Sequence, residues 1–370
     1  MRIVYFSRDY SPHDHRFLSA LADSEHDVHY LRLEKAEPVI EQRPVPAGIS
    51  VIDWWGGRRE LRATDWPRAI IETRQILGRL SPDLVHAGPV QSPAFLAAAA
   101  GFHPLLTMSW GSDLMWDARA GWGRLLARWT LRHSDAFTCD CDAVRRQAVH
   151  LGLDEDRIFV FPWGVDLDRF HPGPATERRE TAGFGSDDLV VLSTRPWERF
   201  FGISELVDGF VQAAQVRPEL RLWMIGRGSL RPYIEERLGL AGLMDRARLD
   251  GPMSNAEMPT IYQSADIYLS ASHSDGSSIS LLEAMACGMP ALVSDIRGNR
   301  EWVLPGENGW WFPTGDAASI GRALERAAER RAQFGRMGQR ARAIAEQRAD
   351  WNRNFEVLLR AYEFTVQEAV

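Results

Sequence analysis

Lysine is almost absent from this chain of 370 residues, because Lys35 is the only one and nearly all of the positive charge is arginine. This shortage excludes two kinds of phosphate chemistry. A P-loop needs the lysine of its GK[ST] motif, and the sequence contains no such motif. A pyridoxal phosphate enzyme needs a lysine for its Schiff base, and Lys35 stands in the surface-like stretch LEKAEP. Any phosphate group bound here must be held by arginine, backbone amides and helix N-termini.

Cysteine, long apolar runs and basic tracts are also scarce. The three cysteines, Cys139, Cys141 and Cys287, are an odd number that fits a reducing compartment, and they do not resemble a metal ligand set. No apolar run reaches membrane-spanning length, and the opening MRIVYFSRDY turns polar too early for a signal peptide. The net charge of −7 gives no general attraction to nucleic acid. These features predict a cytoplasmic globular protein without a nucleic-acid partner.

Strand-like and helix-like segments alternate along the chain. One series runs from RIVYFS to IFVFP, and a second starts at LVVLSTR. This alternation is typical of βαβ units and of parallel, doubly wound sheets. Residues 164–188, between the two series, are rich in Gly, Pro and charge, and we interpret them as a linker. We therefore predict an α/β protein with two Rossmann-like domains that face a central cleft, at 1–165 and 166–350, and a helix at about 351–370 that packs back on the first domain.

The stretch SASHSDGSSISLLEAMACGMP carries most of the chemical information. A strand is followed by a polar loop with one glycine, Gly276, and then by a helix that Ser277 or Ser278 can cap. The N-terminus of such a helix, at the carboxyl end of a parallel sheet, suits a diphosphate. Glu283, in the first turns of the helix, suits the two hydroxyls of a ribose. Asp275 lies in the loop and can accept hydroxyls from a sugar beyond the phosphates.

At these residues the sequence resembles the retaining glycosyltransferases of family 4. The signature of that family has two acidic residues separated by seven others, an EAMA.G.P motif, a later glutamate and an NG pair. The matching residues here are Asp275, Glu283, Ala284, Met285, Ala286, Gly288, Pro290, Glu301, Asn308 and Gly309. FPWGVDLDRFHP, LWMIGRG (with Gly226) and DGPMSNAEMPTIYQSADIYLSAS match further stretches in the family's order. The resemblance therefore extends over most of the chain.

The resemblance implies a GT-B fold and a specific reaction. A sugar would move from a UDP-, GDP- or ADP-sugar to an acceptor hydroxyl with retention at the anomeric carbon. The leaving diphosphate would take the acceptor's proton, and no metal or other cofactor would be required. Arg195, after the strand DLVVLS, would grip the diphosphate in the C-terminal donor domain, with Gly226 and Asp275 nearby. The N-terminal domain would hold the acceptor, which is a saccharide, a lipid-linked glycan, a lipid or a small metabolite.

The sequence departs from the family pattern at three positions. Asp275 stands where the first acidic residue is usually glutamate, Phe201 replaces a diphosphate-binding lysine, and Trp110 replaces a common histidine. Arg199, in the loop before Phe201, and Arg227, in the GRG turn, either supply the missing charge or are ordinary solvated side chains. Because of these departures, a non-catalytic nucleotide-sugar or glycan binder remains an alternative hypothesis.

Candidate residues also follow the first strand of the N-terminal domain, where loops of an open sheet face the ligand. His13, Asp14 and Arg16, in YSPHDHRF, are candidates for contacting the acceptor or the diphosphate. The alternative is that Asp14 caps the next helix and that the histidine is solvated. His86, at the end of the strand DLVHA, either faces the cleft or is a core histidine.

Two more candidates lie in SWGSDL. Trp110 is a candidate wall of the sugar site, because an indole face packs against the C–H face of a sugar. Asp113 either takes a catalytic role beside the reacting sugar or caps the helix that follows.

The helix expected in GWGRLLARWTLRH mixes tryptophan and leucine with arginine. Such a face can rest on an anionic membrane that carries a lipid acceptor. The alternative is an amphipathic helix whose apolar side lies in the core. A membrane surface that the chain contacts peripherally is therefore one possible partner in this interpretation.

Overall fold

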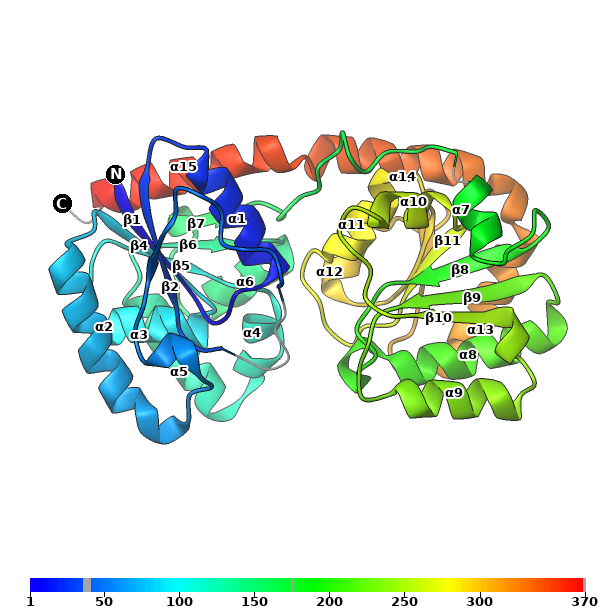
Figure 1. Cartoon of the computed structure of the whole chain (residues 1–370), viewed down its shortest axis with the longest axis horizontal. Helices are drawn as coiled ribbons and strands as arrows, with labels where there is room; N and C mark the ends of the chain where they lie inside the picture. Colours follow the sequence, from blue (N-terminus) through cyan, green and yellow to red (C-terminus); the bar gives the residue numbers. More distant parts are fainter. Residues whose placement is uncertain (36–40, 175, 369–370) are drawn as a thin grey trace. The chain divides into compact units, whose positions relative to one another are not determined.

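The computed structural model describes residues 1–35, 41–174 and 176–368. The chain splits into two compact units (Figure 1). Unit 1 comprises Met1–Pro162 and Arg353–Val370, and unit 2 comprises Trp163–Asn352. No helix in the described ranges is long and apolar enough to cross a membrane.

Unit 1 is built on a seven-stranded sheet with the order β3-β2-β1-β4-β5-β6-β7, in which all paired strands are parallel. Its strands are β1 (Arg2–Ser7), β2 (Asp27–Arg32), β3 (Ser50–Ile52), β4 (Leu84–Gly88), β5 (Leu105–Met108), β6 (Ala136–Cys139) and β7 (Ile158–Val160). Its helices are α1 (Pro12–Ala22), α2 (Trp66–Leu80), α3 (Phe95–Ala99), α4 (Ser112–Met115), α5 (Gly121–Arg132), α6 (Asp142–His150) and most of α15 (Trp351–Glu368). Shorter helical turns are η1 (Gly56–Arg58), η2 (Ala63–Asp65), η3 (Val90–Ala94), η4 (Asp117–Arg119) and η5 (Glu155–Arg157).

Unit 2 is built on a six-stranded sheet, also with parallel pairing, in the order β10-β9-β8-β11-β12-β13. Its strands are β8 (Leu189–Ser193), β9 (Leu220–Ile225), β10 (Ala247–Asp250), β11 (Ile267–Ser270), β12 (Ala291–Ser294) and β13 (Gly309–Phe312). Its helices are α7 (Thr176–Thr181), α8 (Ile203–Val216), α9 (Arg231–Leu240), α10 (Met258–Gln263), α11 (Ile279–Ala286), α12 (Arg297–Arg300), α13 (Ala317–Glu329) and α14 (Phe334–Arg348), with the turns η6 (Arg199–Phe201), η7 (Met244–Arg246) and η8 (Arg331–Gln333).

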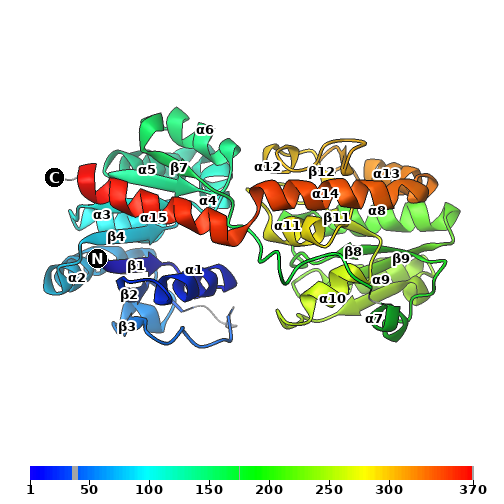
Figure 2. The same ribbon diagram turned by 90° about the horizontal axis from the view of Figure 1, so that it is seen from above.

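Helices cover both faces of each sheet (Figure 2), and inner strands such as β4, β5, β8 and β11 are therefore buried along their whole length. In unit 2, Val190 and Leu192 of β8 belong to one core cluster and Leu189 and Val191 to another. Successive side chains of a strand point to opposite faces, so two clusters are what a sheet between two helix layers requires. The two parallel α/β sheets confirm the predicted pair of Rossmann-like domains.

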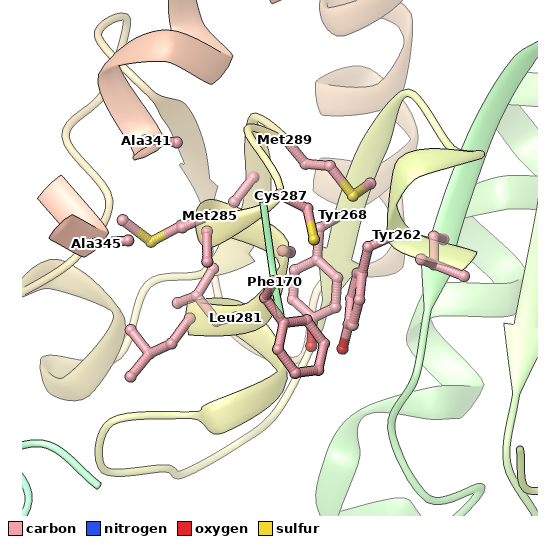
Figure 3. Close-up of a cluster of buried hydrophobic side chains, with 14 of the residues drawn as sticks. Phe170, Tyr262, Tyr268, Leu281, Met285, Cys287, Met289, Ala341 and Ala345 are labelled. Carbon is pink, nitrogen blue, oxygen red and sulfur yellow. The ribbon is translucent and has the colours of Figure 1, made fainter. Parts of the chain in front are cut away.

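One of these clusters lies beneath α11 (Figure 3). Leu281 and Met285 of that helix pack there with Phe170, Tyr262 and Tyr268. The two tyrosine hydroxyls lie at the same end of the cluster in this view. The cluster therefore fixes α11 against β11 and brings two polar groups to the start of that helix.

The interpretation of residues 164–188 as a linker is wrong. Val165, Phe170 and Phe184 are buried in the core cluster beneath α11. Burying these apolar side chains stabilises the segment against unit 2, which outweighs its Gly, Pro and charged composition. The segment is therefore part of unit 2.

Candidate functional site

The candidate site of unit 2 begins where β8 ends. Arg195 lies two residues past this strand, and its side chain is 12% exposed. Its Nη2 donates to Asp275 Oδ2 at 2.6 Å, and its Nη1 donates to the hydroxyls of Ser278 at 2.8 Å and Ser280 at 3.2 Å. The guanidinium is therefore held at the N-terminal end of α11. Arg195 and Asp275, both predicted from the sequence, lie in direct contact.

Phe201 occupies the position of the expected lysine and supports the same guanidinium. The Cζ of Arg195 lies 4.5 Å from the centroid of the Phe201 ring, which is the geometry of a cation–π contact. Gly202 follows with a φ of +64°, and a Cβ there would lie 2.1 Å from the carbonyl oxygen of Ala271. Only glycine fits this close approach, so the backbone next to Phe201 is fixed. The Nε of Arg195 is buried and has no hydrogen-bond partner in the part of the chain that the structure describes.

Ser278 is the N-cap residue of α11, but its hydroxyl makes no capping bond to the helix. The expected hydrogen bond from the helix backbone to the Ser278 hydroxyl is therefore not formed, because this hydroxyl accepts from Arg195 instead. Ser277 is also buried, and its hydroxyl accepts from the indole of Trp302 at 3.0 Å. Gly276 is buried in the loop before them, against the backbone of Gly298. The two serine hydroxyls thus connect the start of α11 to Arg195 and to Trp302.

Glu283 lies one turn further along α11 and is 9% exposed. Its Oε2 accepts from the hydroxyl of Tyr262 at 2.9 Å, and that hydroxyl also lies 3.2 Å from Thr194 Oγ1. Burial, followed by the Glu283 charge, raises the pKa of Tyr262 well above its usual value, so the phenol stays a donor. Thr194 thus contacts the tyrosine that binds Glu283, and its neighbour Arg195 binds Asp275. The end of β8 is therefore connected to both acidic residues of the signature.

The remaining donor-site candidates, Arg199, Gly226 and Arg227, lie in the loops that follow β8 and β9. Backbone hydrogen bonds connect these two loops. Trp197 N donates to Arg227 O at 2.9 Å, and Leu230 N donates to Trp197 O at 3.0 Å. A Cβ at Gly228 would lie 2.3 Å from Trp197 O, so the loops approach too closely for a larger residue. Arg199 and Arg227 are both exposed. Gly226, at the end of β9, begins the second loop.

Unit 1 contains a cavity of about 270 Å³ at the carboxyl ends of β1, β2, β4 and β5. Arg8 and Glu34 line it and form an ion pair of 2.6 Å. Trp110, Asp113 and Asp117 line it as well. A cavity with an indole face and several carboxylates suits a polyhydroxylated ligand, because carboxylates accept from hydroxyls and rings pack against C–H faces.

Asp113 is buried at the edge of this cavity. It accepts from the backbone of Val90 at 3.0 Å and from Ser109 Oγ at 2.6 Å, and burial raises its pKa to about 6. The expected alternative of an N-cap is not what the structure shows, because Gly111 is the N-cap of α4 and Asp113 lies in its first turn. Asp113 instead holds the loops after β4 and β5 together.

His13 and Trp110 come together, with ring centroids 5.3 Å apart. Asp14, next to His13, turns inward: it forms a capping box with Ser11 at the start of α1 and accepts from Tyr5 OH at 3.0 Å. Burial raises the pKa of Asp14 to about 6. The capping alternative therefore describes Asp14, and Arg16 lies partly buried on the same helix.

His86 lies in the core of unit 1 and not at a ligand-facing edge, which corrects the cleft interpretation. It is 0% exposed, and its Nδ1 lies 2.9 Å from the hydroxyl of Tyr362 on α15. Its ring meets that of Tyr5 edge-on at 5.1 Å. Burial lowers the pKa of His86 to about 3, so the ring is neutral.

Several residues of these sites had no strong signal in the sequence. Ser280 and Tyr268 support Arg195, with the tyrosine hydroxyl 2.7 Å from Ser280 Oγ, and Tyr262 holds Glu283. Serine and tyrosine are common in strands and helix starts, so only the fold singles them out. Within the described residues, no group of three or more His, Cys, Asp or Glu side chains is arranged to hold a metal ion.

Two protein-family models match the chain. The Glycosyltransferase Family 4 model covers residues 13–169, and the Glycosyl transferases group 1 model covers residues 175–344. The D-inositol 3-phosphate glycosyltransferase of Geodermatophilus obscurus is 29% identical over 236 residues, which are 61% of this chain and 52% of that protein. This chain spans about half of the length of the curated relatives that it matches.

Solved structures resemble the whole chain. The sucrose-phosphate synthase of Thermosynechococcus elongatus has a TM-score of 0.81 at 17% identity, covering 98% of both chains. Anabaena HepE in complex with UDP-glucose has a TM-score of 0.78 at 18% identity, covering 98% of this chain and 100% of that one. At this identity the likeness establishes the fold alone. Residues 13–169 and residues 175–344 thus each match a glycosyltransferase family model, and the chain has a GT-B fold.

Proposed function

We propose that this protein is a retaining glycosyltransferase that moves a sugar from a nucleotide-diphosphate sugar to an acceptor hydroxyl. The observation that carries the proposal is the arrangement at the start of α11, where a partly buried arginine contacts an aspartate and two serine hydroxyls. This arrangement lies in the group 1 domain, and the UDP-glucose complex of HepE, which has the same fold, supports a nucleotide-sugar donor.

In this proposal Arg195 and the N-terminus of α11 bind the diphosphate. Arginine binds phosphate oxygens through its planar fork, and the helix terminus adds backbone amides and a positive dipole end. Both stabilise the charge that grows on the leaving diphosphate, which then takes the proton of the acceptor. Glu283 accepts the ribose hydroxyls, and Asp275 accepts hydroxyls of the transferred sugar. Arg199 and Arg227 add charge from the two loops beside Arg195.

We propose that the cavity of unit 1 holds the acceptor. Trp110 and Asp113 line this cavity, and His13 packs against the Trp110 ring. Arg16, on the same helix as His13, is a further candidate for contacting the acceptor. The acidic lining favours a polyhydroxylated group, and one matched relative is named a D-inositol 3-phosphate glycosyltransferase. The acceptor is a saccharide, a lipid-linked glycan or a small metabolite. We also propose a cytoplasmic location, with peripheral contact at a membrane when the acceptor is lipid-linked.

The test is release of nucleoside diphosphate from a panel of UDP-, GDP- and ADP-sugars, followed by NMR of any transferred product. We expect release from donors of one base and an anomeric configuration that matches the donor. A β-linked product from an α-linked donor would contradict the retaining assignment. Tight binding without release or transfer across the panel would instead support a non-catalytic nucleotide-sugar binder, for which the changes at Phe201 and Trp110 are the motivation.

Phe201 should matter through Arg195. Replacing Phe201 with leucine keeps an apolar side chain but removes the ring, and we expect kcat to fall about fivefold, because a partly desolvated cation–π contact contributes about 1 kcal/mol. Phe201→Tyr keeps the ring and should stay close to the parent. Steady-state kinetics of both variants measure this, and equal kcat values for Phe201→Leu and the parent would show that the contact does not position Arg195.

A further inference from the structure

Large apolar side chains protrude from α5 and from the turn before it. Trp122 is 86% exposed, Leu125 59% and Trp129 38%, and Trp116 before the helix is 43% exposed. The three helix positions are spaced i, i+3 and i+7, so they lie along one side of α5. These four side chains form the α5 apolar face.

The α5 apolar face is anchored at one end and free at the other. The ring of Trp129 lies 5.4 Å from that of Phe95 and stacks on His133 at 4.1 Å. Leu125 and Trp122, one and two turns earlier, are far more exposed. The helix is thus fixed to unit 1 while two large apolar groups stand in solvent, where each costs hydration free energy.

Positive charge surrounds this face. Between residues 116 and 133 the sequence has four arginines and a single acidic residue, Asp117, although the whole chain carries a net charge of −7. Arg128 and Arg132 are exposed, and they follow one another at helical spacing beside the apolar stripe. Arg119 places its Cζ 4.4 Å from the ring centroid of Trp116. Apolar and cationic groups are therefore presented together.

We propose that the α5 apolar face docks on an anionic lipid surface. Trp122 and Leu125 enter the boundary between headgroups and acyl chains, and the arginines contact lipid phosphates. Tryptophan and leucine beside a row of arginine is the composition of helices that lie in a membrane interface. Each arginine near an anionic surface adds attraction that is screened by salt. This inference rests on the peripheral membrane contact of the proposed function and assigns it to α5, and it uses no residue of the donor site.

The test is flotation of the full chain with vesicles of phosphatidylcholine alone or mixed with phosphatidylglycerol. We expect binding to the mixed vesicles only, and weaker binding at about 1 M salt, where the Debye length falls to roughly 3 Å. The double variant Trp122→Ser, Leu125→Ser should bind at least about tenfold more weakly. Arg128→Ala combined with Arg132→Ala should also weaken binding and reduce its dependence on salt.

Leu240→Ser is the matched control, because Leu240 on α9 is 75% exposed and lies in unit 2. It should bind vesicles like the parent. All substituted residues are exposed, so melting temperatures should agree and exclude unfolding as the cause. Failure of the parent to float with anionic vesicles would overturn the proposal. It would also be overturned if the parent formed dimers that Trp122→Ser, Leu125→Ser abolished while vesicle binding stayed unchanged, because the face would then bind a second copy.

Discussion

Replacing Arg195 with alanine is expected to lower kcat about a hundredfold. Arg195 holds a guanidinium at the start of α11, where it contacts Asp275, Ser278 and Ser280. Removing one preorganised donor from a developing anion typically slows turnover by about a hundred- to a thousandfold. The charge on the leaving diphosphate grows toward the transition state, so KM for the donor should change less than kcat.

The measurement is initial rates across donor concentrations for Arg195→Ala and for a matched control. Arg322→Ala removes an arginine that pairs with Asp316 at 3.7 Å on α13, outside the site, and should leave kcat unchanged. Arg199→Ala and Arg227→Ala should have smaller effects, because both side chains are exposed. A kcat of Arg195→Ala within a few-fold of the parent would show that the diphosphate is held elsewhere.

Replacing Glu283 with glutamine is expected to weaken the donor interaction by about ten- to a hundredfold. A hydrogen bond to a charged, buried group contributes roughly 1.5–3 kcal/mol, and the amide turns one of the two acceptor oxygens into a donor. The ribose diol needs both acceptors, so KM for the donor should rise. Binding of the free nucleoside diphosphate should weaken by a similar factor.

Tyr262→Phe distinguishes the contact of Glu283 with Tyr262 from its proposed contact with the ribose. It removes the hydroxyl that donates to Glu283 Oε2 at 2.9 Å and leaves the carboxylate in place. If Glu283 acts on the ribose, Tyr262→Phe should raise KM much less than Glu283→Gln does. Equal increases of KM in both variants would mean that the weaker donor interaction comes from the lost Tyr262 contact. An unchanged KM in Glu283→Gln would mean that the donor does not bind at α11.

The sequence predicted what depends on local pattern. The alternation of strand and helix patterns predicted the two parallel sheets, because buried strands and the helices between them have distinct hydrophobic periodicities. Ser277 or Ser278 was expected to begin α11, and Ser278 is its N-cap residue; Arg195 was expected after β8 and lies two residues past it, since both expectations follow from the order of elements. The contact of these two residues was not predicted, because it joins positions that are 83 residues apart.

Tertiary packing decided the remaining cases. His86 belongs to the core because Tyr362, 276 residues later, comes to lie against it. Residues 164–188 have the composition of a linker, yet Phe170 and Phe184 draw them into unit 2. The sequence pattern of α5 favoured a helix with its apolar side in the core, and only the fold shows that Trp122 is exposed.

The central claim is that the start of α11 holds a nucleoside diphosphate, and titration calorimetry with UDP, GDP and ADP tests it most directly. The free diphosphate already carries the charge that a donor acquires only as its bond to the sugar breaks, so it should depend strongly on Arg195. We expect one of the three nucleotides to bind the parent with a stoichiometry of one, and Arg195→Ala and Glu283→Gln each to weaken that binding at least about tenfold, or about 1.4 kcal/mol. If none of the three binds, or if both variants bind as tightly as the parent, this site is not the donor site.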